Sequence, residues 1–187
     1  RKLLMKAIIM AAGVGKRLHA LNINKPKCLI TVGSTTLIRR SVNLLVNKGI
    51  SDITVIVGFK GHLIRNELNN DVAYFENPDF HSTNSIKSLW YAKDLLEDNV
   101  LLLNGDLYYE HVILDYAINQ TNPVVMLADS TRIDNADYRF SFSGDQINQF
   151  GKHLTNHETD GEYVGIVRID QCFIKPFKQT LEEMITA

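Results

Sequence analysis

The chain has 187 residues, of which 45% are hydrophobic and 22% are charged, and its formal net charge at pH 7 is −1. These values are typical of one globular domain and exclude disordered, collagen-like and coiled-coil classes. No apolar run approaches the roughly 20 residues that cross a bilayer, no secretory signal peptide is visible, and 2 cysteines cannot form a disulfide framework. We therefore expect a cytoplasmic protein without a membrane partner.

In chain order, apolar strands alternate with amphipathic helices as far as Asp129. We expect strands at 6–11, 53–57, 72–75, 100–103 and 124–128, separated by helices at 34–48, 62–68, 85–96 and 111–118. Ser34 or Thr35 can cap the 34–48 helix, and Gly49 can end it. The alternation predicts a mostly parallel sheet with helices on both faces.

After Asp129 the pattern changes to short alternating strands. We expect strands at 138–143 and 146–150 around a Gly144-Asp145 turn, then a strand at 163–169 and a closing helix at 177–185. No linker or internal repeat divides the chain, so we expect a single domain over residues 1–187.

The positive charges are concentrated near the N-terminus. The first acidic residue is Asp52, and half of all the Lys and Arg residues precede it. This uncompensated segment is suited to a negatively charged ligand, although the net charge of the whole chain is close to zero.

A glycine-rich basic loop follows the first predicted strand, with the sequence Ala11-Ala12-Gly13-Val14-Gly15-Lys16-Arg17-Leu18. Glycines let the backbone turn tightly and point its N–H groups at an anion, and Lys16 and Arg17 add positive charge there. The loop is not a Walker A motif, because Arg17 stands where Ser or Thr is required. It is not the dinucleotide fingerprint either, because Leu18 stands at the third glycine position. Glycine spacing alone leaves an ordinary strand-to-helix turn equally open.

Two shorter motifs add candidate residues. In Lys25-Pro26-Lys27 the proline restricts the backbone, so Lys27 can be held in one direction, although for this tripeptide alone a surface turn with two solvated lysines is the better explanation. Asn104-Gly105-Asp106 follows the predicted strand 100–103, at the edge where open α/β sheets bind ligands. An aspartate there can hold Mg²⁺, and its position favours this role over an Asx turn.

Together these motifs resemble the nucleotidyltransferases of the sugar-nucleotide pyrophosphorylase fold. The stretch from 6 to 38, KAIIMAAGVGKRL…KPKCLITVGSTTLI, is similar to the G-x-G-x-R-L…P-K-x-L signature of that family. Asn77-Pro78 and TNSIKSLW at 83–90 resemble its cytidylyltransferase branch, which acts on phosphocholine, 2-aminoethylphosphonate or related compounds. Gly151-Lys152 and the segment 161–166 are similar to the acceptor side of that branch.

The resemblance implies a fold and a reaction. The fold would be a Rossmann-like three-layer α/β/α domain of the nucleotide-diphospho-sugar transferase type, with a small β excursion after the main sheet. The reaction would transfer CMP from CTP to a small phosphate or phosphonate acceptor, with Mg²⁺ as cofactor and pyrophosphate as the second product. Nucleic acid is not an expected partner, and the oligomeric state is not readable.

Roles for individual residues also come from the resemblance. Arg17 would clamp the β and γ phosphates, Lys27 would lie near the α-phosphate, and Asp106 would hold Mg²⁺. The other nucleotide-binding residues would be Ala11, Ala12, Gly13, Val14, Gly15, Lys16, Asn84, Ser88 and Gly105. On the acceptor side we expect Asp129, Lys152 and Glu162; Lys152 would contact the phosphoryl group, and acids after the 124–128 strand would suit an ammonium group.

Two departures from the family pattern bear on these expectations. The family supplies a second metal-binding aspartate in a region that would follow Ala187, and within this chain Asp170 is a candidate by position only. We therefore expect the domain to lack its C-terminal end. Residues 1–4 precede the natural-looking start at Met5 and are expected to be an upstream or vector-derived remnant.

Three other functions remain open at this stage. A sugar-1-phosphate nucleotidyltransferase using dTTP, UTP or GTP would share the glycine loop and the Pro-Lys motif. A non-catalytic nucleotide-binding module could have the same fold. A nucleic-acid-binding domain could use the basic N-terminal segment, but that segment lacks interleaved aromatic residues and the sequence pI is ≈ 6.6.

Overall fold

A parallel four-stranded sheet forms one half of the molecule. The computed structural model describes residues 5–15, 24–82, 84–131, 133–134 and 136–186. Strands β5 (Ala73–Glu76), β4 (Asp52–Val57), β1 (Met5–Ala11) and β6 (Asn99–Asn104) lie side by side in that order and are all parallel. The central strands are continuous apolar runs because both faces of the sheet are covered. The predicted parallel sheet is confirmed.

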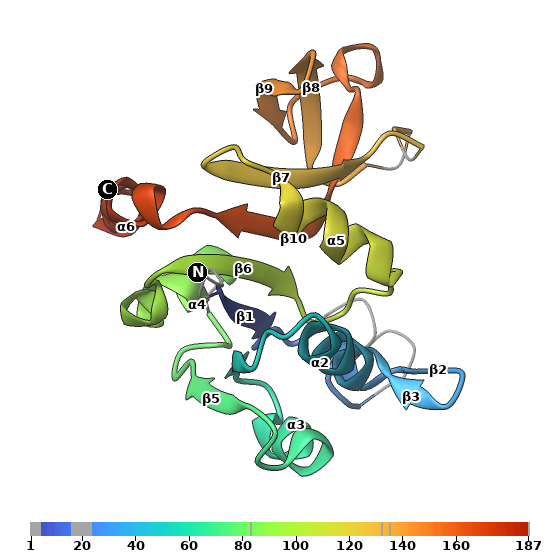
Figure 1. Cartoon of the computed structure of the whole chain (residues 1–187), viewed down its shortest axis with the longest axis vertical. Helices are drawn as coiled ribbons and strands as arrows, with labels where there is room; N and C mark the ends of the chain where they lie inside the picture. The colour runs from blue at the N-terminus through green and yellow to red at the C-terminus, as the bar shows by residue number, and fades with distance from the viewer. Residues whose placement is uncertain (1–4, 16–23, 83, 132, 135, 187) are drawn as a thin grey trace.

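The second half of the sheet is antiparallel and is built on one long strand. Strand β10 (Gly161–Ile169) inserts beside β6 and runs antiparallel to it. Strand β7 (Val124–Asp129) pairs with most of β10, and β8 (Arg139–Ser143) pairs with its first residues. Strand β9 (Gln146–Gly151) then pairs with β8 across the predicted Gly144-Asp145 turn. The expected β excursion is therefore continuous with the main sheet and projects at the top of Figure 1.

Helices cover both faces of the sheet, as the alternation predicted. Helices α2 (Leu37–Asn47), α3 (Gly61–Leu68) and α5 (His111–Asn119) bury their apolar sides in one core cluster. Helices α4 (Ser85–Tyr91) and α6 (Gln171–Thr186) contribute to a second cluster. Figure 1 shows α2 and α5 on one side of the sheet and α4 with α6 on the other. This arrangement is the expected three-layer α/β/α architecture.

Several predicted element boundaries were wrong. The helix expected at 34–48 begins at Leu37, because Thr31–Val32 (β2) and Thr35–Thr36 (β3) pair first as a small hairpin. Thr36 is its cap and accepts a hydrogen bond from the Arg39 backbone N–H at 3.2 Å. Gly49 follows the helix in the left-handed region, as expected, with φ 77°.

Two further helices differ from their predicted limits. The helix expected at 85–96 ends at Tyr91 and continues as a separate 3-10 turn, η2 (Lys93–Leu95). The closing helix begins at Gln171 and not at 177, so it contains Pro176. Burial of Ile174 and Leu181 on one side keeps the whole segment helical despite the proline.

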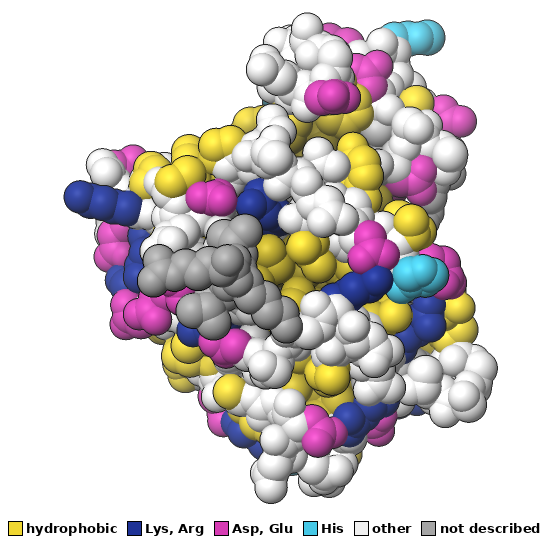
Figure 2. Space-filling model, viewed as in Figure 1, with side chains coloured by type: hydrophobic (Ala, Val, Ile, Leu, Met, Phe, Trp, Pro, Cys, Tyr) yellow, Lys and Arg dark blue, Asp and Glu magenta, His cyan; other side chains and the backbone are white. Residues whose placement is uncertain are grey.

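The outer surface carries a central hollow on the face shown in Figure 2. Hydrophobic side chains line this hollow, and basic and acidic side chains stand around its rim. None of the helices in the described part of the chain is both long and apolar enough to cross a membrane.

Candidate functional site

The carboxyl ends of β1 and β6 bring two predicted motifs together. Met10 lies opposite Asn104 in the parallel ladder, so the glycine loop and Asn104-Gly105-Asp106 leave the sheet as neighbours. The Gly105 backbone N–H donates to the Met10 carbonyl at 2.9 Å, which extends the ladder by one bond. This is the edge at which open α/β sheets bind ligands.

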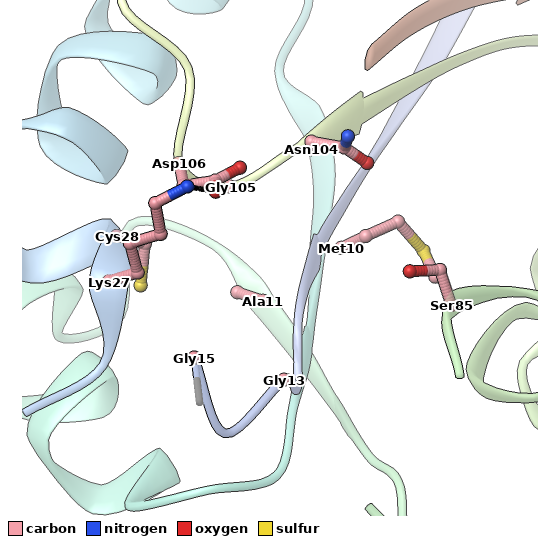
Figure 3. A pocket seen from close by; sticks show the side chains of 10 residues that line it. All are labelled: Met10, Ala11, Gly13, Gly15, Lys27, Cys28, Ser85, Asn104, Gly105 and Asp106. Atoms are coloured by element: carbon pink, nitrogen blue, oxygen red, sulfur yellow. Dashed lines mark hydrogen bonds and ion pairs between the residues drawn. The ribbon is translucent and has the colours of Figure 1, made fainter. Parts of the chain in front are cut away.

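A pocket of ≈ 210 Å³ opens between these strand ends. Figure 3 shows Lys27 reaching Asp106 on one wall, Met10, Asn104 and Ser85 on the other, and the two loop glycines below. The pocket is lined by Met10, Ala11, Gly13, Gly15, Lys27, Cys28, Ser85, Asn104, Gly105 and Asp106. Seven of these residues, Ala11, Gly13, Gly15, Lys27, Asn104, Gly105 and Asp106, belong to the motifs that the sequence singled out.

Lys27 and Asp106 form an ion pair inside this pocket. Lys27 opens a 3-10 turn, η1 (Lys27–Leu29), in which the Leu29 N–H donates to the Pro26 carbonyl at 3.0 Å. Pro26 has φ −53°, so the ring constraint sets the direction in which Lys27 leaves the chain. The Lys27 side chain is 51% exposed and that of Asp106 is 30% exposed, so both remain accessible to a ligand.

Each glycine of the site occupies its position for a different structural reason. A Cβ at Gly105 would lie 3.0 Å from the Ala11 Cβ and 3.1 Å from the Met10 carbonyl, so only glycine fits against β1 without displacing backbone. Gly15 adopts φ 64°, a left-handed conformation that side chains rarely adopt. A Cβ at Gly13 would meet nothing within 4 Å, so its backbone faces open space and can be approached by an anion.

A second pocket of ≈ 320 Å³ adjoins the first across the glycine loop. It shares Gly13 and Gly15 and is otherwise lined by Val14, Phe80, His81, Ser82 and Asn84. The Phe80 and His81 rings contact each other at an interplanar angle of 35°, with centroids 3.9 Å apart. Sequence reasoning missed these two aromatic residues. The available signal for them was their position between β5 and α4, which places them at the same edge of the sheet as the first pocket.

Asn84 and Ser88 shape the start of α4. Asn84 caps the helix by accepting from the Lys87 N–H at 3.0 Å, and it lines the second pocket. Ser88 is buried, accepts from Asn77 Nδ2 at 2.8 Å and donates to the Asn84 carbonyl at 3.1 Å. Asn77 is itself fully buried and accepts from the Asp79 N–H at 2.9 Å. The Ser88 hydroxyl is therefore engaged within the protein, and its cytidine contact stays a prediction.

The structure shows what surrounds two further residues near the first pocket, Ala12 and Cys28. The Ala12 side chain is buried, and its carbonyl accepts from the Phe59 N–H at 3.1 Å, so Ala12 fixes the loop from inside. Cys28 is buried below the pocket, and burial, with a smaller contribution from Asp106, raises the pKa of its thiol to about 12. Lys16 and Arg17 lie outside the described residues, so their predicted phosphate contacts stay predictions.

The predicted acceptor residues gather around the start of β10. Glu162 accepts from the Asp137 N–H at 2.8 Å, and Lys152 Nζ lies 3.9 Å from Asp137 Oδ1. Asp129 faces Glu162 in the β7–β10 ladder and accepts from the Thr131 N–H at 2.8 Å. None of the three predicted residues lines either pocket.

This acceptor cluster, Asp129, Asp137, Lys152 and Glu162, lies at the same sheet edge as the first pocket. Gly165 passes so close to Asn104 that a Cβ there would lie 2.5 Å from Asn104 Nδ2. Glu162 precedes Gly165 on the same strand, so the cluster begins roughly 10 Å from Asn104 at a strand rise of about 3.3 Å per residue.

Asp170 does not fit the second metal position. It follows β10, whose last residue Ile169 pairs with Val100 at the start of β6. At about 3.3 Å per residue, Asp170 lies roughly 20 Å from Asp106, at the opposite edge of the sheet. Its carboxylate accepts from the Cys172 N–H at 3.0 Å and from Arg168 at 3.2 Å, and the first of these bonds lowers the pKa of Asp170. Asp170 therefore caps α6. It lies far from Asp106 because β10 runs antiparallel to β6 and so ends where β6 begins.

The donor set at the first pocket fits a magnesium ion bound together with phosphates. Mg²⁺ typically takes one or two protein carboxylates and completes its shell with water and phosphate oxygens. Asp106 supplies one accessible carboxylate, and no group of three or more His, Cys, Asp or Glu side chains forms a metal cage in the described part of the chain. A site completed by the nucleotide is the type that these residues could build.

Comparison with known proteins agrees with this geometry. Residues 6–137 match the sequence model of the family described as Nucleotidyl transferase. A CTP:phosphoglutamine cytidylyltransferase of Campylobacter jejuni is 24% identical over 91% of this chain and 75% of its own length. A 2-aminoethylphosphonate cytidylyltransferase of Lancefieldella rimae is 37% identical over 63% of this chain, and the match covers 47% of its own length.

Solved structures show the same fold. The CTP:phosphocholine cytidylyltransferase of Streptococcus pneumoniae superimposes with a TM-score of 0.74 and 22% identity, over 98% of this chain and 78% of its own. A glucose-1-phosphate thymidylyltransferase structure from Bacillus anthracis gives a TM-score of 0.77 and 20% identity, over 94% of this chain and 75% of its own. The fold is therefore that of nucleotidyltransferases with different nucleotides and acceptors. Since the family match extends over more than two thirds of the sequence, from β1 through the loop after β7, the chain belongs to the nucleotidyl transferase family.

Proposed function

We propose that the protein transfers CMP from CTP to a small phosphate or phosphonate acceptor and releases pyrophosphate. The observation that carries the proposal is the Lys27–Asp106 ion pair in a pocket that the glycine loop also lines. Lys27 can neutralise phosphate charge, and Asp106 can hold a cation. The cytidylyltransferase names of three relatives, from Campylobacter, Lancefieldella and Streptococcus, support CTP as the nucleotide.

The proposed reaction needs neither a general base nor a covalent intermediate. An acceptor oxygen, already anionic near neutral pH, attacks the α-phosphorus; the bond from that phosphorus to the bridging oxygen breaks, and pyrophosphate leaves with the electron pair. The protein must bring two anions together and hold them in line, so positioning and charge neutralisation supply the acceleration.

Each motif has a place in this scheme. Backbone N–H groups at Gly13 and Gly15 approach the triphosphate, and Arg17 clamps its terminal oxygens through a planar fork. Lys27 neutralises the charge that develops at the α-phosphate. Asp106 holds Mg²⁺, which when bound supplies charge neutralisation for the phosphate oxygens. The second pocket, with Asn84 and the Phe80 and His81 rings, has the apolar and polar surfaces that a cytidine needs.

The acceptor class is proposed from the acceptor cluster. Lys152 suits a phosphate or phosphonate group, whereas Asp129, Asp137 and Glu162 suit an ammonium group. Tyr163 packs against Phe140 with ring centroids 6.0 Å apart, and burial raises its pKa to about 12. Tyr138, which is 45% exposed, can lie beside a quaternary ammonium. We therefore propose phosphocholine or 2-aminoethylphosphonate as the acceptor.

We also propose a cytoplasmic location. Cys28 and Cys172 are both free thiols, which suits a reducing compartment.

The test is pyrophosphate release measured with each of the four nucleotides CTP, UTP, dTTP and GTP against a panel of acceptors. The panel contains phosphocholine, 2-aminoethylphosphonate and glucose 1-phosphate. We expect release only with CTP and an amine-bearing or choline-bearing acceptor, only with Mg²⁺ present, and not in Asp106→Ala. Release with glucose 1-phosphate and another nucleotide would establish a sugar-1-phosphate nucleotidyltransferase, and binding of CTP without turnover would establish a non-catalytic module.

A further inference from the structure

Arg40 lies outside both pockets but contacts the segment that carries Asp106. Its Nη2 donates to the Tyr109 carbonyl at 2.8 Å and to Glu110 Oε1 at 3.2 Å. Its guanidinium also stacks over the Tyr108 ring, 4.6 Å from the ring centroid. One planar side chain therefore contacts three consecutive residues, and it is enclosed enough that its Nε atom is fully buried.

These contacts fix the far end of the short segment 105–110 between β6 and α5. The near end is fixed by the Gly105 N–H, which donates to the Met10 carbonyl at 2.9 Å. Tyr109 is buried beside Ser41, and burial raises its pKa, an effect that Ser41 and Arg40 partly offset. Asp106 thus stands between two anchored points.

Helix α2 also supports the other partner of the ion pair. The Leu37 N–H, at the start of α2, donates to the Ile30 carbonyl at 3.0 Å, directly after the 3-10 turn that begins with Lys27. The same helix therefore holds Lys27 through its N-terminus and the Asp106 segment through Arg40.

We infer that Arg40 is a positioning residue for the reaction: it clamps Tyr108, Tyr109 and Glu110 and so holds the Asp106 carboxylate where it binds the metal with the nucleotide. The inference rests on the proposed function, in which Asp106 holds that metal. Lysine cannot replace Arg40 fully, because a point charge does not stack on Tyr108 while donating to two oxygens in one plane.

The neighbouring residue Arg39 is a matched control. It lies on the same helix and is similarly enclosed, but it points to the other side, where it pairs with Asp71 at 2.5 Å and donates to the Glu67 carbonyl. Arg39→Met therefore removes an equivalent set of contacts from α2 without touching the segment that carries Asp106.

The first measurement is amide hydrogen exchange, which needs neither substrate nor turnover. The Ile113 N–H donates to the Glu110 carbonyl at 3.0 Å, so the amides of Gly105 and Ile113 report on the two ends of the segment. In Arg40→Met we expect exchange at these two amides to increase about 10-fold, because the segment opens more often. In Arg39→Met the increase should appear instead near Glu67 and Asp71. Equal protection of Gly105 and Ile113 in wild type and Arg40→Met would overturn the inference.

The second measurement is Mn²⁺ binding to the enzyme–CTP complex, followed by electron paramagnetic resonance. Residues that orient a metal ligand typically contribute about 10–100-fold to affinity, so Arg40→Met should bind Mn²⁺ at least about 10-fold more weakly. Arg40→Lys should recover part of the loss, and Arg39→Met should match wild type. Unchanged affinity in Arg40→Met, or an equal loss in Arg39→Met, would contradict the positioning role.

Asp106→Asn separates the two possible failures. If Asp106→Asn binds Mn²⁺ as wild type does, the metal role of Asp106 in the proposed function is wrong and the inference falls with it. If Asp106→Asn loses Mn²⁺ and Arg40→Met does not, the proposed function stands and the inference alone is overturned.

Discussion

At the scale of single residues, the site depends on two side chains far apart in the sequence. Lys27 was singled out because it follows a proline, and Asp106 because it follows a buried strand; the structure joins them in an ion pair. Their separation of 79 positions explains why their pairing could not be predicted from local patterns. The sequence could name the candidates, but only the β1–β6 register and the turn that begins at Lys27 together place them in contact.

Replacement of Lys27 tests its catalytic role. We expect Lys27→Ala to lower kcat by about 10²–10³-fold, comparable to the loss of one preorganised electrostatic donor at a reacting centre. Lys25→Ala is the matched control, because Lys25 lies on the other side of Pro26 and lines neither pocket. Steady-state pyrophosphate release measures both. Near wild-type turnover in Lys27→Ala, or an equal loss in Lys25→Ala, would remove Lys27 from the mechanism.

The two cysteines should differ sharply in reactivity. Burial raises the pKa of Cys28 to about 12, so its thiol stays protonated and inaccessible at pH 8, whereas Cys172 is exposed. An aromatic disulfide reagent should label Cys172 in the native protein and label Cys28 only after urea is added. Cys172→Ser should then show no native labelling. Rapid native labelling in Cys172→Ser would mean that the floor of the pocket is open to solvent.

The raised pKa of Cys28 also predicts how the free energy of unfolding changes with pH. In the unfolded chain the thiol has its ordinary pKa of 9.0, whereas in the folded protein it stays neutral until about pH 12. The free energy of unfolding should therefore fall as pH rises from about 9 towards 12, because only the unfolded state loses this proton. Urea unfolding of wild type and Cys28→Ala at pH 8 and pH 10 measures this; an equal pH dependence in both proteins would contradict it.

At the scale of elements, strands were predicted more reliably than helix ends. Buried parallel strands are short apolar runs, so β1, β4 and β6 could be located from composition alone. Helix ends depend on side-chain caps and on pairing with distant segments, as the β2–β3 hairpin before α2 shows. The roles of Asn84 and Ser88 in holding α4 likewise depend on Asn77, which arrives from the end of β5.

The buried Asn77–Ser88 hydrogen bond should contribute to the stability of this element. Ser88→Ala leaves the buried Asn77 amide without that acceptor, so we expect a loss of about 1–3 kcal/mol in the free energy of unfolding. Ser82→Ala, at an exposed hydroxyl of the same segment, should change stability by less than about 0.5 kcal/mol. Urea unfolding measures both. An unchanged Ser88→Ala stability with a raised KM for CTP would show that Ser88 contacts the nucleotide directly.

The two glycines at the strand ends should respond differently to a methyl group. Gly105→Ala forces a Cβ to within 3.0 Å of the Ala11 Cβ, and overpacking of this kind costs about 1–3 kcal/mol. Gly13→Ala meets nothing within 4 Å and should keep wild-type stability while placing its methyl in the nucleotide pocket. Thermal unfolding and KM for CTP separate the two effects. Destabilisation by Gly13→Ala without loss of CTP affinity would assign the loop a structural role only.

At the scale of the whole molecule, the sheet order was the least predictable feature. Alternating strands and helices predicted the parallel half, but β10 returns from late in the chain to lie between β6 and β7. No local pattern encodes that insertion, because strand pairing is decided by packing across the whole domain. The insertion is what brings the acceptor cluster to the edge where Lys27 and Asp106 lie, and it is also what places Asp170 at the opposite edge.

The most direct test of the account is ³¹P nuclear magnetic resonance of one reaction mixture. The wild-type protein is incubated with CTP, Mg²⁺ and either phosphocholine or 2-aminoethylphosphonate. We predict equal amounts of pyrophosphate and of a product in which CMP is joined through its α-phosphorus to the acceptor oxygen, with neither formed by Asp106→Ala. Release of orthophosphate with CDP, or no CMP adduct with either acceptor, would contradict the central claim that this pocket transfers CMP.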